Sequence, residues 1–339
     1  MPSMPQRVLI IKPSSLGDVA TALPMLCDLR RAYPGARIDW LVAPAFAALV
    51  RGHDAVNEVL LFERRELGAW WYSPGALGKF RDLNRRLRAG NYDCVVDAQG
   101  LLRSGYFAWV TGATMRIGFA DAREGGGMFY THRVAIRREE AMAVVRMRAL
   151  LDPLGVQHDG APEYRVPLGA EAVAKAAAVV PAGGRGAIGF IPGSRGEGKR
   201  WSAEGFAHVI SVLAKEHAVV LFGSPDEREL CEEIVRRSGS AGCARVNLAG
   251  KTNIAEMTAA LARCRLIIGN DTGPLHVAVA LGRPILGLYG KTDPRSVGPY
   301  GQLENVVRFT PDAPWQATAD TVIERAASLL ASPESSGVC

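Results

Sequence analysis

Short runs of apolar and β-branched residues alternate along the chain with longer segments of helical period. The first half contains the runs "RVLII", "RIDWLV", "EVLLF" and "DCVVDA", and a segment of helical period covers residues 76–89. Runs that are apolar at nearly every position are typical of parallel strands buried on both faces. The pattern therefore predicts the α/β class, with a parallel sheet and crossover helices.

The periodicity weakens between Gly155 and Gly186, which predicts a linker. A second series follows, with the runs "AIGFI", "AVVLF", "VNL", "LIIG" and "PILGLY" and helical segments near residues 202–216 and 226–237. We therefore predict two Rossmann-like domains, residues 1–165 and 166–316. A last helix in residues 317–339 is a candidate to pack back on the first domain.

The length and the charge of the chain further restrict which class of protein it can be. The 339 residues are enough for two hydrophobic cores, and no apolar run is long enough to span a bilayer. The first residues, "MPSMPQR", lack the apolar core of a signal peptide, so we expect a cytoplasmic protein. Most of the net charge of +6 falls in the first half, which fits either an anionic partner or a solvated surface. The six cysteines form no CxxC pair, so we expect neither disulfides nor zinc.

One carboxylate follows the first predicted strand. In "KPSSLGDV", Asp18 falls in the first turn of a helix, at the end of a parallel strand where ligands bind in such sheets. A carboxylate there also interacts favourably with the helix dipole, so a catalytic role and a capping role both remain open. The loop lacks GxGxxG and GxxxxGK[ST], and it predicts no phosphate site in the first domain.

Three loops of the second half carry groups suited to a nucleotide diphosphate. "NDTGPLH" offers backbone amides and a histidine at a helix start, "IPGSRGEGKRW" offers cations, and "FGSPDERE" offers a carboxylate for ribose hydroxyls. Helix capping or a solvated basic loop would also explain each of them alone. The candidate donor-site residues are Ser194, Arg195, Lys199, Asp226, Asp271, Thr272, Gly273 and His276.

The glycine-rich segment "DAREGGGMFYTHR" predicts a mobile loop, either a substrate lid or a connector.

Six motifs, in order between Arg7 and Tyr300, resemble the lipopolysaccharide heptosyltransferases of glycosyltransferase family 9, most closely the heptosyltransferase I branch. They are "LIIKPSSLGDVATALP", "DAQGLLRS", "DAREGGGMFY", "KRW", "NDTGPLHVAVALGRP" and "YGKTDP". The resemblance implies a GT-B fold, two Rossmann-like domains with a cleft between them. It further implies transfer of heptose from ADP-heptose, bound by the second domain, to a Kdo sugar on lipid A, bound by the first. The anomeric centre is inverted.

The resemblance also implies residue roles. Asp18 matches the general base, Lys199 the donor phosphate lysine, and Asp271 a residue that holds heptose hydroxyls. Thr272, Gly273 and His276 match the diphosphate cradle, and Asp226 matches the ribose contact.

On the acceptor side, Arg64, Arg65 and Arg123 match cations that bind the acceptor. The family usually has a histidine where this chain has Met142, a departure that concerns the acceptor more than the chemistry.

Cations at the diphosphate can stabilise the leaving group without a metal, and the sequence shows no cluster of metal ligands. We therefore expect no tightly bound cofactor, with ADP-heptose as co-substrate and room for stimulation by magnesium. We expect no nucleic-acid partner, a monomer, and peripheral contact with the inner face of the inner membrane through the lipid acceptor.

Alternative functions remain open at this point. Heptosyltransferases II and III share the "DTG" and "YG.TDP" elements, and a sugar-nucleotide 2-epimerase can use the same fold. A sugar-nucleotide sensor without chemistry would have little use for Asp18. A dehydrogenase is disfavoured because GxGxxG is missing after the first strand.

Overall fold

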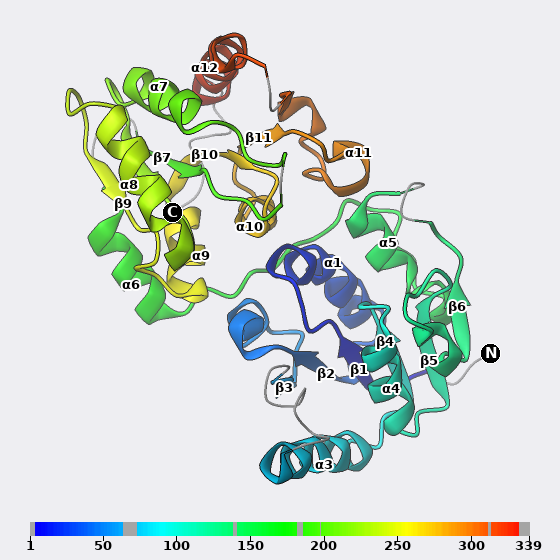
Figure 1. Ribbon diagram of the computed structural model, residues 1–339. Helices are drawn as coiled ribbons and strands as arrows, with labels where there is room; N and C mark the ends of the chain where they lie inside the picture. Colours follow the sequence, from blue (N-terminus) through cyan, green and yellow to red (C-terminus); the bar gives the residue numbers. More distant parts are fainter. Residues whose placement is uncertain are drawn as a thin grey trace. The chain divides into compact units, whose positions relative to one another are not determined.

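The computed structural model describes residues 4–63, 73–137, 141–181, 186–196, 198–310 and 313–331. The chain forms two compact units, Met1–Pro167 and Leu168–Cys339, so their boundary lies two residues from the predicted one. Each unit contains one sheet flanked by helices (Figure 1). This confirms the predicted α/β class.

The sheet of the first unit is parallel at every pairing. Its strands are β1 (Arg7–Ile11), β2 (Arg37–Val42), β3 (Glu58–Leu61), β4 (Cys94–Asp97), β5 (Met115–Phe119) and β6 (His132–Val134). They lie in the order β3-β2-β1-β4-β5-β6. The winding therefore reverses between β1 and β4, and ligands of doubly wound sheets bind beside such a reversal.

Helices cover both faces of this sheet. They are α1 (Leu16–Ala32), α3 (Pro74–Ala89), α4 (Leu102–Val110) and α5 (Ala143–Ala149), with 3-10 helices η1 (Pro44–Leu49), η2 (Gly126–Phe129) and η3 (Asp152–Leu154). On one face, Leu83 of α3 and Phe107 of α4 pack on Leu9 and Ile11 of β1. Helix α1 packs with α5. The central strand β1 is thus fixed by packing, and so is the loop that follows it.

The second unit repeats the same strand order. Its strands are β7 (Ala187–Ile191), β8 (Ala218–Leu221), β9 (Arg245–Asn247), β10 (Cys264–Asn270), β11 (Ile285–Tyr289) and β12 (Val306–Arg308). They are parallel throughout, in the order β12-β11-β10-β7-β8-β9. Here the winding reverses between β7 and β10.

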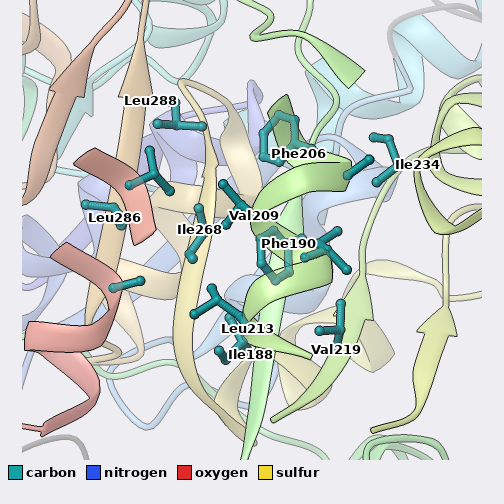
Figure 2. Packing of buried hydrophobic residues seen from close by; sticks show 14 of the residues in the cluster. Ile188, Phe190, Phe206, Val209, Leu213, Val219, Ile234, Ile268, Leu286 and Leu288 are labelled. Atoms are coloured by element: carbon teal, nitrogen blue, oxygen red, sulfur yellow. The ribbon is translucent and has the colours of Figure 1, made fainter. Parts of the chain in front are cut away.

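The helices of the second unit enclose an aromatic and aliphatic core. They are α6 (Ala170–Val179), α7 (Ala203–Leu213), α8 (Arg228–Arg237), α9 (Ile254–Ala262), α10 (Gly273–Ala280), α11 (Pro294–Val297) and α12 (Trp315–Ala331), with 3-10 helices η4 (Pro225–Glu227) and η5 (Leu303–Asn305). Figure 2 shows Phe206 and Val209 of α7 against Phe190 of β7 and Ile268 of β10. None of the helices in the described ranges is long and apolar enough to cross a membrane.

The last helix belongs to the second unit, whereas we expected it as a candidate for packing on the first domain. Its residues Ala319, Val322, Ala326 and Leu330 are buried in the core of the second unit, where α12 packs on α7. These four positions recur at helical spacing, so they form one apolar stripe, and that stripe is taken up by α7 and the neighbouring strands.

The glycine-rich segment is a packed turn, where we predicted a mobile loop. It forms η2 and leads into β6. A Cβ added at Gly126 would lie 2.7 Å from the carbonyl carbon of Leu101, and the Tyr130 hydroxyl donates to Asp97 Oδ2 at 2.6 Å. The glycines therefore permit close approach of two backbones.

A buried ion pair joins α1 to α5. Arg148 donates through Nε to Asp28 Oδ2 at 2.5 Å, and the two side chains are 5% and 1% exposed. The same guanidinium donates to the carbonyl of Gly160 at 2.8 Å, and Arg31 donates to Asp28 at 3.1 Å. A carboxylate so buried depends on its partners, because it has lost its hydration.

Arg148→Ala should lower the free energy of unfolding by about 3–5 kcal/mol, because it leaves Asp28 buried with one exposed partner. Urea unfolding followed by tryptophan fluorescence measures the loss. Arg85→Ala is the control: Arg85 and Asp82 pair at 77% and 62% exposure, so that loss should stay below about 1 kcal/mol. Equal, small losses in both variants would contradict this account of the α1–α5 contact.

Candidate functional site

The loop after β1 holds Asp18 at the carboxyl edge of the first sheet. Ser15 is the N-cap of α1, and Asp18 is the third helical residue. The Ser15 backbone amide and hydroxyl donate to Asp18 Oδ2 at 3.0 and 2.8 Å. These bonds form a capping box, so the carboxylate is fixed in place whether or not it also does chemistry. Asp18 is half-buried, at the edge where the sequence placed it.

The turn after β4 supports this loop. Asp97 is fully buried, and burial raises the pKa of its carboxyl group against the opposing effect of its hydrogen bonds. Asp97 Oδ1 accepts from the amides of Gln99 and Gly100 at 2.9 and 3.2 Å. The Gln99 side-chain carbonyl in turn accepts from the Ser14 amide at 3.3 Å. The β4 turn and the Asp18 loop are thus hydrogen-bonded neighbours at the reversal point.

A pocket opens between these two loops and the first turn of α4. Its lining residues are Pro13, Ser14, Phe62, Gln99, Leu101, Arg103, Ser104, Phe107 and Glu124. The lining combines apolar rings with one cation and one carboxylate, a mixture suited to a small polar ligand. Our sequence analysis used "DAQGLLRS" only as a motif and did not single out Gln99, Arg103 or Ser104. They could have been identified from their position directly after the predicted apolar strand "DCVVDA".

Of the three arginines expected at the acceptor, one can be placed. The Arg123 amide donates to the Gly100 carbonyl at 2.9 Å, its side chain is exposed, and the next residue, Glu124, lines the pocket. Arg64 and Arg65 lie outside the described residues.

In the second unit, Asp271 lies at the centre of the predicted donor site. It follows β10, is 6% exposed, and receives an ion pair from Lys199 Nζ at 2.7 Å. His276 Nε2 lies 3.8 Å from its other oxygen, and the Ser194 hydroxyl donates to its backbone carbonyl at 3.0 Å. The structure therefore brings together four of the eight predicted donor-site residues, from two loops about 75 positions apart in sequence.

The electrostatics of this cluster keep Asp271 ionised. Burial alone would raise its pKa, but interactions with His276 and Lys199 outweigh that effect and lower the pKa to about 2. An ionised, immobile carboxylate is thus held at the reversal point of the sheet, with a cation in contact with it.

Asn270, buried immediately before Asp271, connects the same two loops. Its side chain accepts from the Trp201 amide at 3.1 Å and donates to the Pro192 carbonyl at 2.7 Å. The loop that carries Lys199 is therefore tied at both ends to the end of β10. Our sequence analysis did not assign a role to Asn270.

Thr272 and Gly273 begin α10 beside this cluster. Thr272 is the N-cap, its side chain makes no capping hydrogen bond, and both residues are half-buried. The start of α10 therefore adjoins Asp271, and its role as a diphosphate cradle stays a prediction.

The neighbouring carboxylates Asp226 and Glu227 differ in their exposure and in their contacts. Asp226 is exposed in η4, whereas the next residue, Glu227, lies against the end of β7: a Cβ added at Gly193 would collide with its carboxylate. Glu227 also accepts from the Ser224 amide at 2.8 Å. Of these neighbouring carboxylates, Glu227 is the one that lies against the loop after β7. Arg195 is exposed in the β7 loop.

A second cation, which our sequence analysis missed, approaches the same loop. The stem of Lys291 lies over Gly198, where an added Cβ would be 2.6 Å from its Cδ, and its amide donates to the Gly198 carbonyl at 3.1 Å. Arg308 fixes this turn by donating to the carbonyls of Gly290 and Thr292 at 2.6 and 2.8 Å. Lys291 could have been identified from its position in the turn directly after the last long apolar run, "PILGLY".

Within the described ranges, no group of three or more His, Cys, Asp or Glu side chains is placed to hold a metal ion. Five cysteines of these ranges are free thiols: Cys27, Cys94, Cys231, Cys243 and Cys264.

Comparisons with known proteins agree with this geometry. The family model described as glycosyltransferase family 9 (heptosyltransferase) matches residues 80–322. The chain is 31% identical over 332 residues to lipopolysaccharide heptosyltransferase 1 of Escherichia coli K12, covering 95% of this chain and all of that protein. It is 29% identical over 317 residues to lipopolysaccharide heptosyltransferase 2 of Salmonella typhimurium, covering 89% and 88%.

Among solved structures, the E. coli heptosyltransferase WaaC with ADP superposes with a TM-score of 0.79 at 28% identity, over 95% of this chain and 99% of that one. The chain thus has the GT-B fold predicted from its sequence. Because the family model and full-length relatives agree, the chain belongs to glycosyltransferase family 9, the heptosyltransferase family.

Proposed function

We propose that this enzyme transfers L-glycero-D-manno-heptose from ADP-heptose to a Kdo residue of the lipopolysaccharide inner core on lipid A, with inversion at the anomeric carbon. One observation carries the proposal: Lys199 is held by the buried Asp271 at the reversal point of the second sheet, beside the start of α10. A related E. coli heptosyltransferase, 26% identical, has been solved with ADP-2-deoxy-2-fluoro heptose, which supports a donor of this class. The relatives named lipopolysaccharide heptosyltransferase 1 support a lipopolysaccharide acceptor.

On the donor side, the leaving group is a nucleoside diphosphate on which negative charge grows as the sugar departs. Lys199 and the amides at the start of α10 stabilise that charge, because fixed positive groups act most strongly where charge develops. Asp271, ionised and fixed, accepts hydrogen bonds from heptose hydroxyls. Glu227 accepts hydrogen bonds from the ribose.

On the acceptor side, the attacking sugar hydroxyl is a poor nucleophile at neutral pH. Asp18 takes its proton as general base, which requires about 3 Å between the two oxygens in the reacting complex. The first-unit pocket, with Arg103 in its lining and Arg123 adjacent, receives the acidic acceptor sugar. The transfer needs no resident cofactor, magnesium can stimulate it in solution, and the enzyme acts as a monomer at the inner face of the inner membrane.

Asp18→Asn should lower kcat at least about 100-fold, the usual scale for loss of a positioned base, with little change in donor KM. An asparagine oxygen can still accept the hydrogen bond from the Ser15 amide, so the melting temperature should remain close to that of the wild type. Steady-state kinetics with ADP-heptose and a Kdo-containing acceptor measure the effect. Near-normal kcat would reduce Asp18 to its capping role.

Lys199→Ala should weaken donor binding at least about tenfold, because a charge-assisted contact to the diphosphate is lost. Calorimetric titration of ADP-heptose measures it, with Lys215→Ala, an exposed lysine after α7, as the matched control. Because the variant leaves Asp271 with fewer partners, its melting temperature is measured alongside. An unchanged titration in a folded variant would remove Lys199 from the donor site.

Substitution of the adjacent carboxylates Glu227 and Asp226 tests which of them contacts the ribose. Glu227→Gln should weaken donor binding about tenfold, the scale of a hydrogen bond to a charged group, whereas Asp226→Asn should change it less than about twofold. The same titration compares the two variants. The opposite ranking would return the ribose contact to Asp226, as the sequence first suggested.

A further inference from the structure

Three large apolar side chains are exposed together on the first unit. Leu102 and Trp109 of α4 are 44% and 51% exposed, and Met128 of η2 is 69% exposed. We call these three residues the α4 face. Proteins rarely expose large apolar side chains in a group unless the group meets a partner or a membrane.

Helix α4 and η2, which carry the α4 face, pack against each other. Leu102, Tyr106 and Trp109 recur at helical spacing on α4. The rings of Tyr106 and Trp109 both contact the ring of Phe129 in η2, with centroids 6.5 and 6.3 Å apart. Helix α4 and η2 also approach closely at their glycines, since a Cβ added at Gly105 would lie 2.7 Å from the Gly126 carbonyl oxygen. Met128 and Trp109 are therefore held on a common platform.

Exposed arginines border this face. Arg123 precedes η2, and Arg133 lies beside Gly127, where an added Cβ would be 3.9 Å from its Nε. Arg103, next to Leu102, instead lines the pocket, with its guanidinium 5.9 Å from the centroid of the Phe62 ring. In the described part of the chain, neither Arg123 nor Arg133 forms an ion pair, although the carboxylate of Glu124 lies between Arg123 and η2 in sequence. An apolar patch with a cationic border matches the interface of an anionic bilayer, where tryptophan is enriched and arginines are attracted to lipid phosphates.

The position of the pocket favours a bilayer over other partners. Leu101, Arg103 and Ser104 line the pocket, and Leu102 between them is exposed on the α4 face. A lipid-linked acceptor whose sugar enters the pocket would bring its bilayer to the same turn of α4. This step rests on the proposed function, because it takes the acceptor to be anchored in lipid.

We propose that the α4 face docks on an anionic lipid bilayer, with Trp109 and Met128 inserted at the headgroup boundary and Arg123 and Arg133 on lipid phosphates.

The test is cosedimentation of the full-length protein with vesicles of phosphatidylethanolamine and phosphatidylglycerol, and with vesicles of phosphatidylcholine alone. The wild type should bind the anionic vesicles more tightly, and added salt should weaken the binding. Trp109→Ser with Met128→Ser should reduce the partition coefficient at least about tenfold, because the two apolar side chains that insert into the bilayer are lost. Val173→Ser with Val179→Ser is the matched control, since these α6 residues are 40% and 38% exposed.

Met128→Asp gives a second variant that leaves the Trp109 and Phe129 rings in place, should the double variant fold poorly. It should also lose vesicle binding at least about fivefold. Turnover of a soluble, delipidated acceptor should be unchanged in all these variants, so failure of the proposed function appears separately as absent wild-type turnover.

Vesicle binding that is absent in the wild type, or equal in wild type and face variants, would overturn the proposal. A concentration-dependent dimer in sedimentation velocity that the face variants dissolve, without vesicle binding, would also overturn it and assign the face to a second copy.

Discussion

Parallel pairing of every described strand is the constraint on which both sites depend. It places the loops after the strands at one edge of each sheet, so Lys199 after β7 meets Asp271 after β10. In the first unit, the same parallel pairing brings the turn that carries Gln99 next to the loop that carries Asp18. The Ser14 amide of that loop donates a hydrogen bond to the Gln99 side chain. The positions of these side chains therefore follow from the strand order and from the burial that fixes each strand.

Much of the fold could be predicted because buried parallel strands leave a strong local signal. The strands β1, β2 and β7 coincide with the apolar runs "RVLII", "RIDWLV" and "AIGFI". The strands β5, β6 and β12 were missed; β6 and β12 have three residues each, and so short a segment carries no clear period. The packing partner of α12 could not be predicted either, because an apolar stripe indicates that a helix packs against another element but does not identify that element.

The candidate site was predictable in its residue types and less so in its contacts. Polar residues directly after apolar runs pointed to Asp18, Lys199 and Asp271. Which carboxylate of the η4 turn faces the site depends on backbone direction, which composition cannot give, and the structure favours Glu227 over its neighbour. Lys291 was missed for a similar reason: its approach to Gly198 depends on how two loops pack, not on a motif.

The anomeric configuration of the heptosyl product is the most direct measure of whether the transfer is a single displacement, the reaction in which a general base such as Asp18 suffices. The enzyme would be supplied with the β-linked ADP-heptose donor and a Kdo-containing acceptor, and the one-bond carbon–proton coupling at the new linkage read by NMR. The account predicts an α-linked product, because direct attack by the acceptor hydroxyl inverts the anomeric carbon. A β-linked product would contradict it, since retention requires a second nucleophilic step that a lone base does not provide.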